Sequence, residues 1–154
     1  MTPPIGKSGI VGLIPHAGAM CLLDSVQSWD RATIVCTASS HRDPDHPLAS
    51  DGRLDAVCGI EYAAQAMAIH GALIAATGRR PVAGYLASVR DVVCRAGRLD
   101  LFPDVLEISA GMIAGDAAGA IYEFTLQCGS ETILRGRAAV VIDAGAPPAT
   151  ARLA

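Results

Sequence analysis

A single carboxylate lies within a long apolar stretch of this chain, and it is the strongest candidate for chemistry. Residues 54–77 are mostly alanine and aliphatic residues, and Glu61 is their only charged residue after Asp55. Burial of an unpaired carboxylate costs several kcal/mol, which is comparable to the whole stability of a small domain. Glu61 is therefore expected to have a catalytic role. The alternative is a structural carboxylate, satisfied by backbone amides or by an arginine at a subunit interface.

Two other polar residues share this apolar stretch. Gln65 follows Glu61 by one helical turn and is predicted to lie on the same face, in a binding, bridging or packing role. His70 follows Glu61 by nine residues, which places it on roughly the opposite face, so we expect a core histidine with satisfied hydrogen bonds. The polar loop before the stretch, residues 39–52, contributes two more histidines, His41 and His46.

The pattern of the whole chain predicts one helix and a set of strands. Residues 54–77 are expected to form a long helix that ends at Gly78, before the cations and proline of residues 79–81. Residues 10–24 are expected to form a short helix or turn that leads into a strand. Strands are predicted at 24–29, 32–37, 82–96, 104–114, 120–128 and 132–142, separated by turn residues. This order predicts an α+β fold, in which one antiparallel sheet wraps a helix that has no solvent-exposed face.

Composition argues against several classes of function. The chain has 154 residues, enough for one domain, and a net charge of −3 with Lys7 as its only lysine. No basic run extends beyond Arg79-Arg80, so nucleic-acid binding is not expected. The five cysteines are scattered without zinc-ligand spacing, which indicates reduced thiols in a cytoplasmic protein rather than a metal site. No signal peptide is expected, and the polar residues of the helix argue against a membrane span. The positive mean hydropathy suggests burial against another subunit.

Three stretches together resemble a known enzyme family. Residues 14–24 read Ile-Pro-His-Ala-Gly-Ala-Met-Cys-Leu-Leu-Asp, residues 59–66 read Gly-Ile-Glu-Tyr-Ala-Ala-Gln-Ala, and residues 86–92 read Leu-Ala-Ser-Val-Arg-Asp-Val. In this order they are similar to motifs of the hotdog-fold beta-hydroxyacyl-(acyl carrier protein) dehydratases. The chain looks closest to the divergent dehydratase-like proteins of aryl polyene pigment pathways, and the resemblance covers roughly residues 10–142.

The resemblance implies a fold and a site. It implies a single hotdog domain over residues 1–154, with a core at about 10–142 and a disordered tail at 144–154. In the family, a loop histidine and a helix carboxylate from opposite subunits of a dimer form the catalytic pair. These positions correspond to His46 and Glu61, with His41 as the alternative histidine, while His16 of the first motif is expected to hold a turn. The loop here departs from the family pattern, because it is one residue longer and lacks the usual Pro-Gly before the helix.

The resemblance also implies a reaction. The histidine would remove the alpha proton of a beta-hydroxyacyl thioester, and the carboxyl would protonate the leaving hydroxide. Gln65, Cys58 and Gly59 would bind substrate, with free amides near the helix start, at residues 56–58, holding the thioester oxygen. The expected partners are an acyl carrier protein and a second hotdog subunit, identical or different, and no metal or organic cofactor is expected. The alternatives are a thioesterase in which Glu61 activates water, and a non-catalytic subunit of a heteromeric dehydratase.

Overall fold

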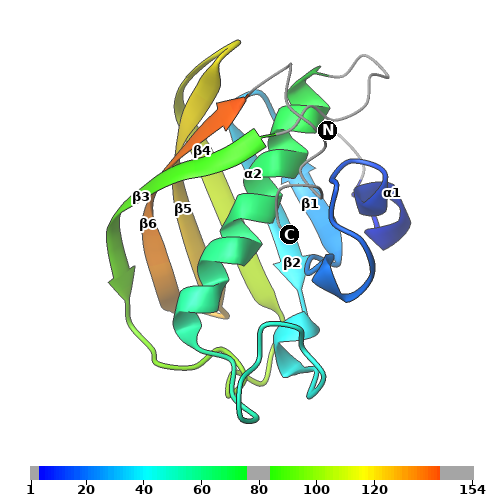
Figure 1. Ribbon diagram of the computed structural model, residues 1–154, viewed down its shortest axis with the longest axis vertical. Coiled ribbons are helices and arrows are strands. Elements are labelled where there is room, and N and C mark those ends of the chain that lie inside the picture. Colours follow the sequence, from blue (N-terminus) through cyan, green and yellow to red (C-terminus); the bar gives the residue numbers. More distant parts are fainter. Residues whose placement is uncertain (1–3, 76–83, 143–154) are drawn as a thin grey trace.

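The computed structural model describes residues 4–75 and 84–142, in which an antiparallel sheet curves around one long helix (Figure 1). The helix, α2, spans Gly59–Ala75. The strands among the described residues lie in the order β1-β2-β4-β5-β6-β3. Their bounds are Ser25–Trp29 for β1, Thr33–Ala38 for β2, Gly84–Cys94 for β3, Leu106–Asp116 for β4, Gly119–Cys128 for β5 and Glu131–Ile142 for β6. The predicted α+β hotdog fold is confirmed.

Most strands that follow one another in the sequence are also neighbours in the sheet. β1 pairs with β2, and β4, β5 and β6 follow one another through tight turns, as the turn residues predicted. β3 instead pairs with β6 at the far edge of the sheet, so the β3–β4 connection passes beside the segment that leads into α2. Two backbone hydrogen bonds hold it there, from Ala56 N to Gly97 O and from Leu99 N to Leu54 O.

Short helical turns complete the described part of the chain. Near the N-terminus, α1 (Lys7–Val11) is followed by a 3-10 turn, η1 (Gly18–Met20), before β1 begins. Two further 3-10 turns lie between β2 and α2, namely η2 (Ser40–Arg42) and η3 (Ala56–Cys58). η3 runs directly into α2, so the α-helix begins five residues later than predicted. The predicted stop signals at 78–81 and the predicted tail at 144–154 lie outside the described residues.

Helix α2 packs closely on the sheet because its inner face carries small residues. A Cβ atom on Gly59 would lie 2.8 Å from Cδ2 of both Leu126 and Leu134, so a larger residue there would push these side chains of β5 and β6 aside. Ala63 and Ala66 are fully buried on the same side. The segment Ala56–Ala75 has the length and hydropathy of a membrane span, but in this fold it forms the central helix that the sheet wraps.

The outer face of α2 is open in the single chain. Exposed or half-buried positions recur every three or four residues, starting at Val57 of η3 and continuing along α2 at Glu61, Ala64, Ala68, Gly71 and Ala75. The prediction that the helix has no solvent-exposed face is therefore wrong for one subunit. The sheet covers only one side of the helix, and the uncovered side is apolar apart from Glu61.

Candidate functional site

Glu61 lies in the first turn of α2, at the border between its buried and its open face. Its side chain is 33% exposed. The Oε1 atom lies 3.1 Å from Nε2 of His16 and 3.3 Å from Nε2 of Gln65. Among the described residues, no hydrogen-bond or ion-pair partner contacts the other oxygen, Oε2. Glu61 is thus a partly exposed carboxylate with one oxygen bound and one oxygen available.

Gln65 links Glu61 to the N-terminal segment of the chain through hydrogen bonds. Its side chain is fully buried. Its Oε1 accepts a hydrogen bond from the Leu22 amide at 3.0 Å, and its Nε2 donates to the Met20 carbonyl at 2.7 Å as well as to Glu61. Gln65 therefore lies on the same face as Glu61, as predicted. It bridges the helix to residues 20–22, so its orientation is set by the backbone.

His16 comes from that same N-terminal segment and lies against Glu61. Its side chain is 15% exposed. Only Nε2 has a partner, because Nδ1 is buried without a hydrogen bond from any described residue. A proton on Nδ1 would have no acceptor, whereas a proton on Nε2 has the carboxylate, so the geometry favours the tautomer protonated at Nε2.

His46 is engaged within its own subunit by other groups. Its ring is buried, Nδ1 accepts a hydrogen bond from the Leu48 amide at 3.0 Å, and Nε2 lies 2.9 Å from the hydroxyl of Tyr62. Tyr62 in turn lies 2.7 Å from Oγ of Ser40. Burial lowers the pKa of His46 below its ordinary value. Within one chain His46 does not contact Glu61, and their pairing across two subunits stays a prediction.

His41, the alternative histidine, anchors the loop to the β3–β4 connection. It is buried, and its Nε2 lies 3.0 Å from the Phe102 carbonyl oxygen. Burial is the main cause that lowers the pKa of His41. This geometry is typical of a histidine that holds a loop in place.

Two amides near the helix start are used inside the chain. The amide of Ala56 donates to the Gly97 carbonyl, and that of Cys58 donates to the Asp55 carbonyl. The expectation of free amides is therefore wrong for Ala56 and Cys58. Burial raises the pKa of the half-buried Cys58 thiol. The close packing of Gly59 against β5 and β6 is sufficient to explain why this position is a glycine. Substrate binding by Cys58 and Gly59 stays a prediction.

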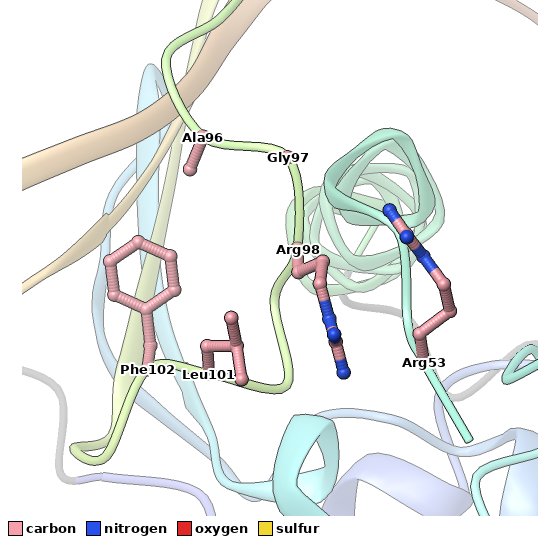
Figure 2. Close-up of a pocket in the computed structure, with 6 residues that line it drawn as sticks. All are labelled: Arg53, Ala96, Gly97, Arg98, Leu101 and Phe102. Atoms are coloured by element: carbon pink, nitrogen blue, oxygen red, sulfur yellow. The ribbon is translucent and has the colours of Figure 1, made fainter.

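A cavity of about 350 Å³ lies beside the helix start, between the segment before η3 and the β3–β4 connection (Figure 2). Its lining combines apolar groups with two guanidinium groups, from residues Arg53, Ala96, Gly97, Arg98, Leu101 and Phe102. Each arginine bonds an aspartate two residues further on, Asp55 at 2.8 Å and Asp100 at 3.1 Å. The hydrogen bond from Arg98 lowers the pKa of Asp100 to about 2. Because both arginines are neutralised locally, the cavity is not strongly electropositive.

Comparison with known proteins identifies the family. The sequence model described as ApeP-like, ApeP dehydratase, matches residues 9–148. The chain belongs to the ApeP-like dehydratases. No curated protein matches the chain.

Solved structures agree with the ApeP-like assignment at the level of the fold. "The Dehydratase Heterocomplex ApeI:P from Xenorhabdus doucetiae" contains a chain that is 22% identical, with a TM-score of 0.78, covering 87% of this chain and 90% of that chain. A mutant thioesterase from Pseudomonas aeruginosa is 12% identical with a TM-score of 0.56, over 78% of this chain and 80% of its own. The PaaI protein of E. coli, from the phenylacetic acid degradation operon, is 12% identical with a TM-score of 0.56, over 75% and 80%.

Sequence reasoning missed the contact between His16 and Glu61. The N-terminal motif predicts a turn-holding role for His16, whereas the structure places its ring against the carboxylate. The contact depends on Gln65, which docks the N-terminal segment on the helix through bonds to Met20 and Leu22. One signal was available, because a lone carboxylate in an apolar helix requires a partner and His16 belongs to one of the same three motifs.

Proposed function

We propose that this chain is a beta-hydroxyacyl-(acyl carrier protein) dehydratase, which removes water from carrier-bound chains in fatty-acid-like or polyene synthesis. Membership of a dehydratase family and the hotdog fold support this proposal. The observation that carries it is the state of Glu61. Two nitrogens bind its Oε1, Oε2 is left available, and the carboxylate lies at the edge of an open apolar face. An apolar acyl chain and a proton-transfer group would meet at this place.

The proposed reaction needs two proton transfers. A base removes the alpha proton, and the electron pair of that C–H bond forms the new C=C bond. The bond between the beta carbon and its hydroxyl breaks, and the oxygen takes the proton of the Glu61 carboxyl and leaves as water. The carboxyl therefore acts as the general acid. This scheme requires no cofactor, because side chains supply both transfers.

We propose His46 of an apposed subunit as the base. Within its own chain both of its ring nitrogens are engaged, by the Leu48 amide and by the Tyr62 hydroxyl. Because Nδ1 accepts from the Leu48 amide, the neutral ring carries its proton on Nε2 and donates it to Tyr62. The lone pair that a base needs is therefore on Nδ1, so participation of His46 requires that the Leu48 bond opens when a second subunit binds. His46→Gln tests this step, because it removes the base and keeps a side chain that can bond Tyr62.

We further propose that a second hotdog subunit covers the open face of α2. The related structure from Xenorhabdus doucetiae is described as a heterocomplex, which supports a different subunit as the partner. The exposed positions Val57, Ala68 and Gly71 are apolar, and such a face is stabilised by burial. Ala68→Glu should weaken the assembly in size-exclusion chromatography. Ala117→Glu, at an exposed position of the β4–β5 turn, is the matched control and should not. A homodimer is the alternative outcome for the wild-type chain alone.

The decisive experiment follows water loss directly. The purified chain, alone and mixed with a candidate partner subunit, is incubated with a beta-hydroxyacyl carrier protein, and the carrier is analysed by mass spectrometry. Loss of water that disappears with Glu61→Gln supports the proposal. Loss of water only in the mixture identifies a heteromeric dehydratase. Release of free acid would identify a thioesterase, and activity that survives Glu61→Gln would contradict the role of Glu61.

A further inference from the structure

We propose that His16 is a positioning residue for Glu61. Together with Gln65, it binds Oε1 of the carboxyl and thereby assigns the reactive proton to Oε2. The consequence for turnover rests on the proposed dehydratase function, but the hydrogen-bond arrangement itself does not. Both donors belong to the same chain as Glu61, so the acid is prepared within one subunit.

The chemistry of the two donors determines which oxygen they leave free. The amide nitrogen of Gln65 only donates, and the Leu22 amide holds the other end of the side chain, so the group cannot be flipped. The buried Nδ1 of His16 has no acceptor among the described residues, which leaves the proton on Nε2, 3.1 Å from Oε1. Two N–H groups therefore converge on one oxygen.

Two N–H donors on one oxygen determine which oxygen of the carboxyl group carries the proton. In the protonated acid one oxygen accepts hydrogen bonds, and the other carries the proton. The oxygen that faces two N–H donors has to be the accepting one, because a hydroxyl proton on Oε1 would compete with them. The acid proton then lies on Oε2, which has no partner among the described residues and is free to reach a substrate.

The same contacts restrict the motion of the Glu61 side chain. A glutamate on a helix surface samples several rotamers, and a side chain that is already held loses less entropy when it reaches the reactive geometry. Gln65 is fully buried and bonded to the backbone at residues 20–22, so one of the donors is rigid. His16 adds the second donor from the segment that Gln65 holds in place.

Two variants of His16 separate positioning from packing. His16→Gln keeps an N–H donor near the position of Nε2, and His16→Leu keeps apolar volume without a donor. We expect His16→Leu to lower kcat about 10-fold with KM changed by less than about 2-fold, since the lost interaction acts on the acid rather than on substrate binding. His16→Gln should retain most of kcat. His70→Gln, elsewhere on the helix, is the matched histidine control and should leave turnover per folded molecule unchanged.

The kinetic outcomes each decide the question. Wild-type kcat in His16→Leu would overturn the proposal, and so would a His16→Gln variant as impaired as His16→Leu. If the wild-type protein shows no dehydration with any partner, the proposed function fails. Nitrogen NMR of the histidine rings then still decides whether His16 donates to Glu61.

Nitrogen NMR of the imidazole rings tests the arrangement without turnover. The sequence has four histidines, so their ring signals can be assigned by substitution. We expect Nε2 of His16 to carry a proton, and Glu61→Gln to shift the His16 signals while those of His70 stay in place. An Nε2 of His16 without a proton, or His16 signals that do not change with Glu61→Gln, would overturn the proposal. Should His16→Leu fold poorly, as a melting curve would reveal, His16→Gln and these spectra decide.

Discussion

Two histidines that contact or belong to α2, His70 and His16, are bonded in different ways. His70 is completely buried, with Nδ1 2.7 Å from the Tyr122 hydroxyl and Nε2 2.7 Å from the Asp30 carbonyl oxygen. His16 has one engaged nitrogen and one that no described residue bonds, and its partner Glu61 is one-third exposed. A buried polar group with every bond made is part of the scaffold. One that is half satisfied, beside a carboxylate at an open face, is the arrangement that our proposal for Glu61 requires.

The largest expected effect is the loss of activity on substitution of Glu61, the partner of His16. Glu61→Gln removes the acid proton and keeps the shape, so dehydration should fall by about 100-fold or more. Stability should change by less than about 0.5 kcal/mol, because the carboxylate is partly exposed. The carrier-protein assay and chemical denaturation measure the two quantities. A large loss of stability with unchanged activity would contradict our assignment of Glu61 to the site and of His70 to the scaffold.

The closed cluster, formed by His70, the Tyr122 hydroxyl and the Asp30 carbonyl, should show the converse pattern, a loss of stability with unchanged turnover. His70→Leu leaves the Tyr122 hydroxyl and the Asp30 carbonyl without their buried partner, at a cost of about 2 kcal/mol in the free energy of unfolding. Turnover per folded molecule should stay at the wild-type level. Tyr122→Phe removes only one of the two bonds and serves as a milder control. A selective loss of turnover in His70→Leu would show that the closed cluster also takes part in catalysis.

The pH dependence of stability should report the buried histidines. Burial lowers the pKa of His70 from its ordinary value of 6.5, as it also does for His41 and His46. The unfolded chain therefore binds more protons than the folded chain as the pH falls below 6.5. Stability should be highest above that pH and decline on acidification, by up to about 1.4 kcal/mol per pH unit for each such histidine. Unfolding curves measured across this range give the slope. His70→Leu should flatten it, and an unchanged slope would contradict the burial argument.

The smallest effect concerns the third cluster, around His46. Tyr62→Phe removes the hydroxyl that lies between His46 and Ser40, and the net loss should be about 1 kcal/mol in the free energy of unfolding. The lone pair of His46 is on Nδ1, away from Tyr62, so loss of the hydroxyl should leave turnover unchanged. A loss of turnover as large as that of His46→Gln would instead place the hydroxyl in the reaction.

The helix, the strands and the core role of His70 could be predicted from the sequence, because they depend on local periodicity. Predicted strand boundaries differ from the observed ones by a few residues, as at β4, which was expected at 104–114 and spans Leu106–Asp116. The contact of His16 with Glu61 depends on tertiary docking through Gln65, which no local pattern encodes. The placement of β3 beside β6 is equally non-local. The open face of α2 was missed because an apolar helix gives no sign of which side a sheet leaves uncovered.

The hydrogen bonds of Gln65 also affect how the chain acquires its site during synthesis. Leu22 and Gln65 are 43 residues apart, and Leu22 is made first. At the usual rate of about 5–20 residues per second, the N-terminal segment waits several seconds before its docking partner is made. The contact between His16 and Glu61 can therefore form only after the central helix has begun to emerge from the ribosome. A nascent chain released before that point would carry the histidine without a carboxylate docked against it.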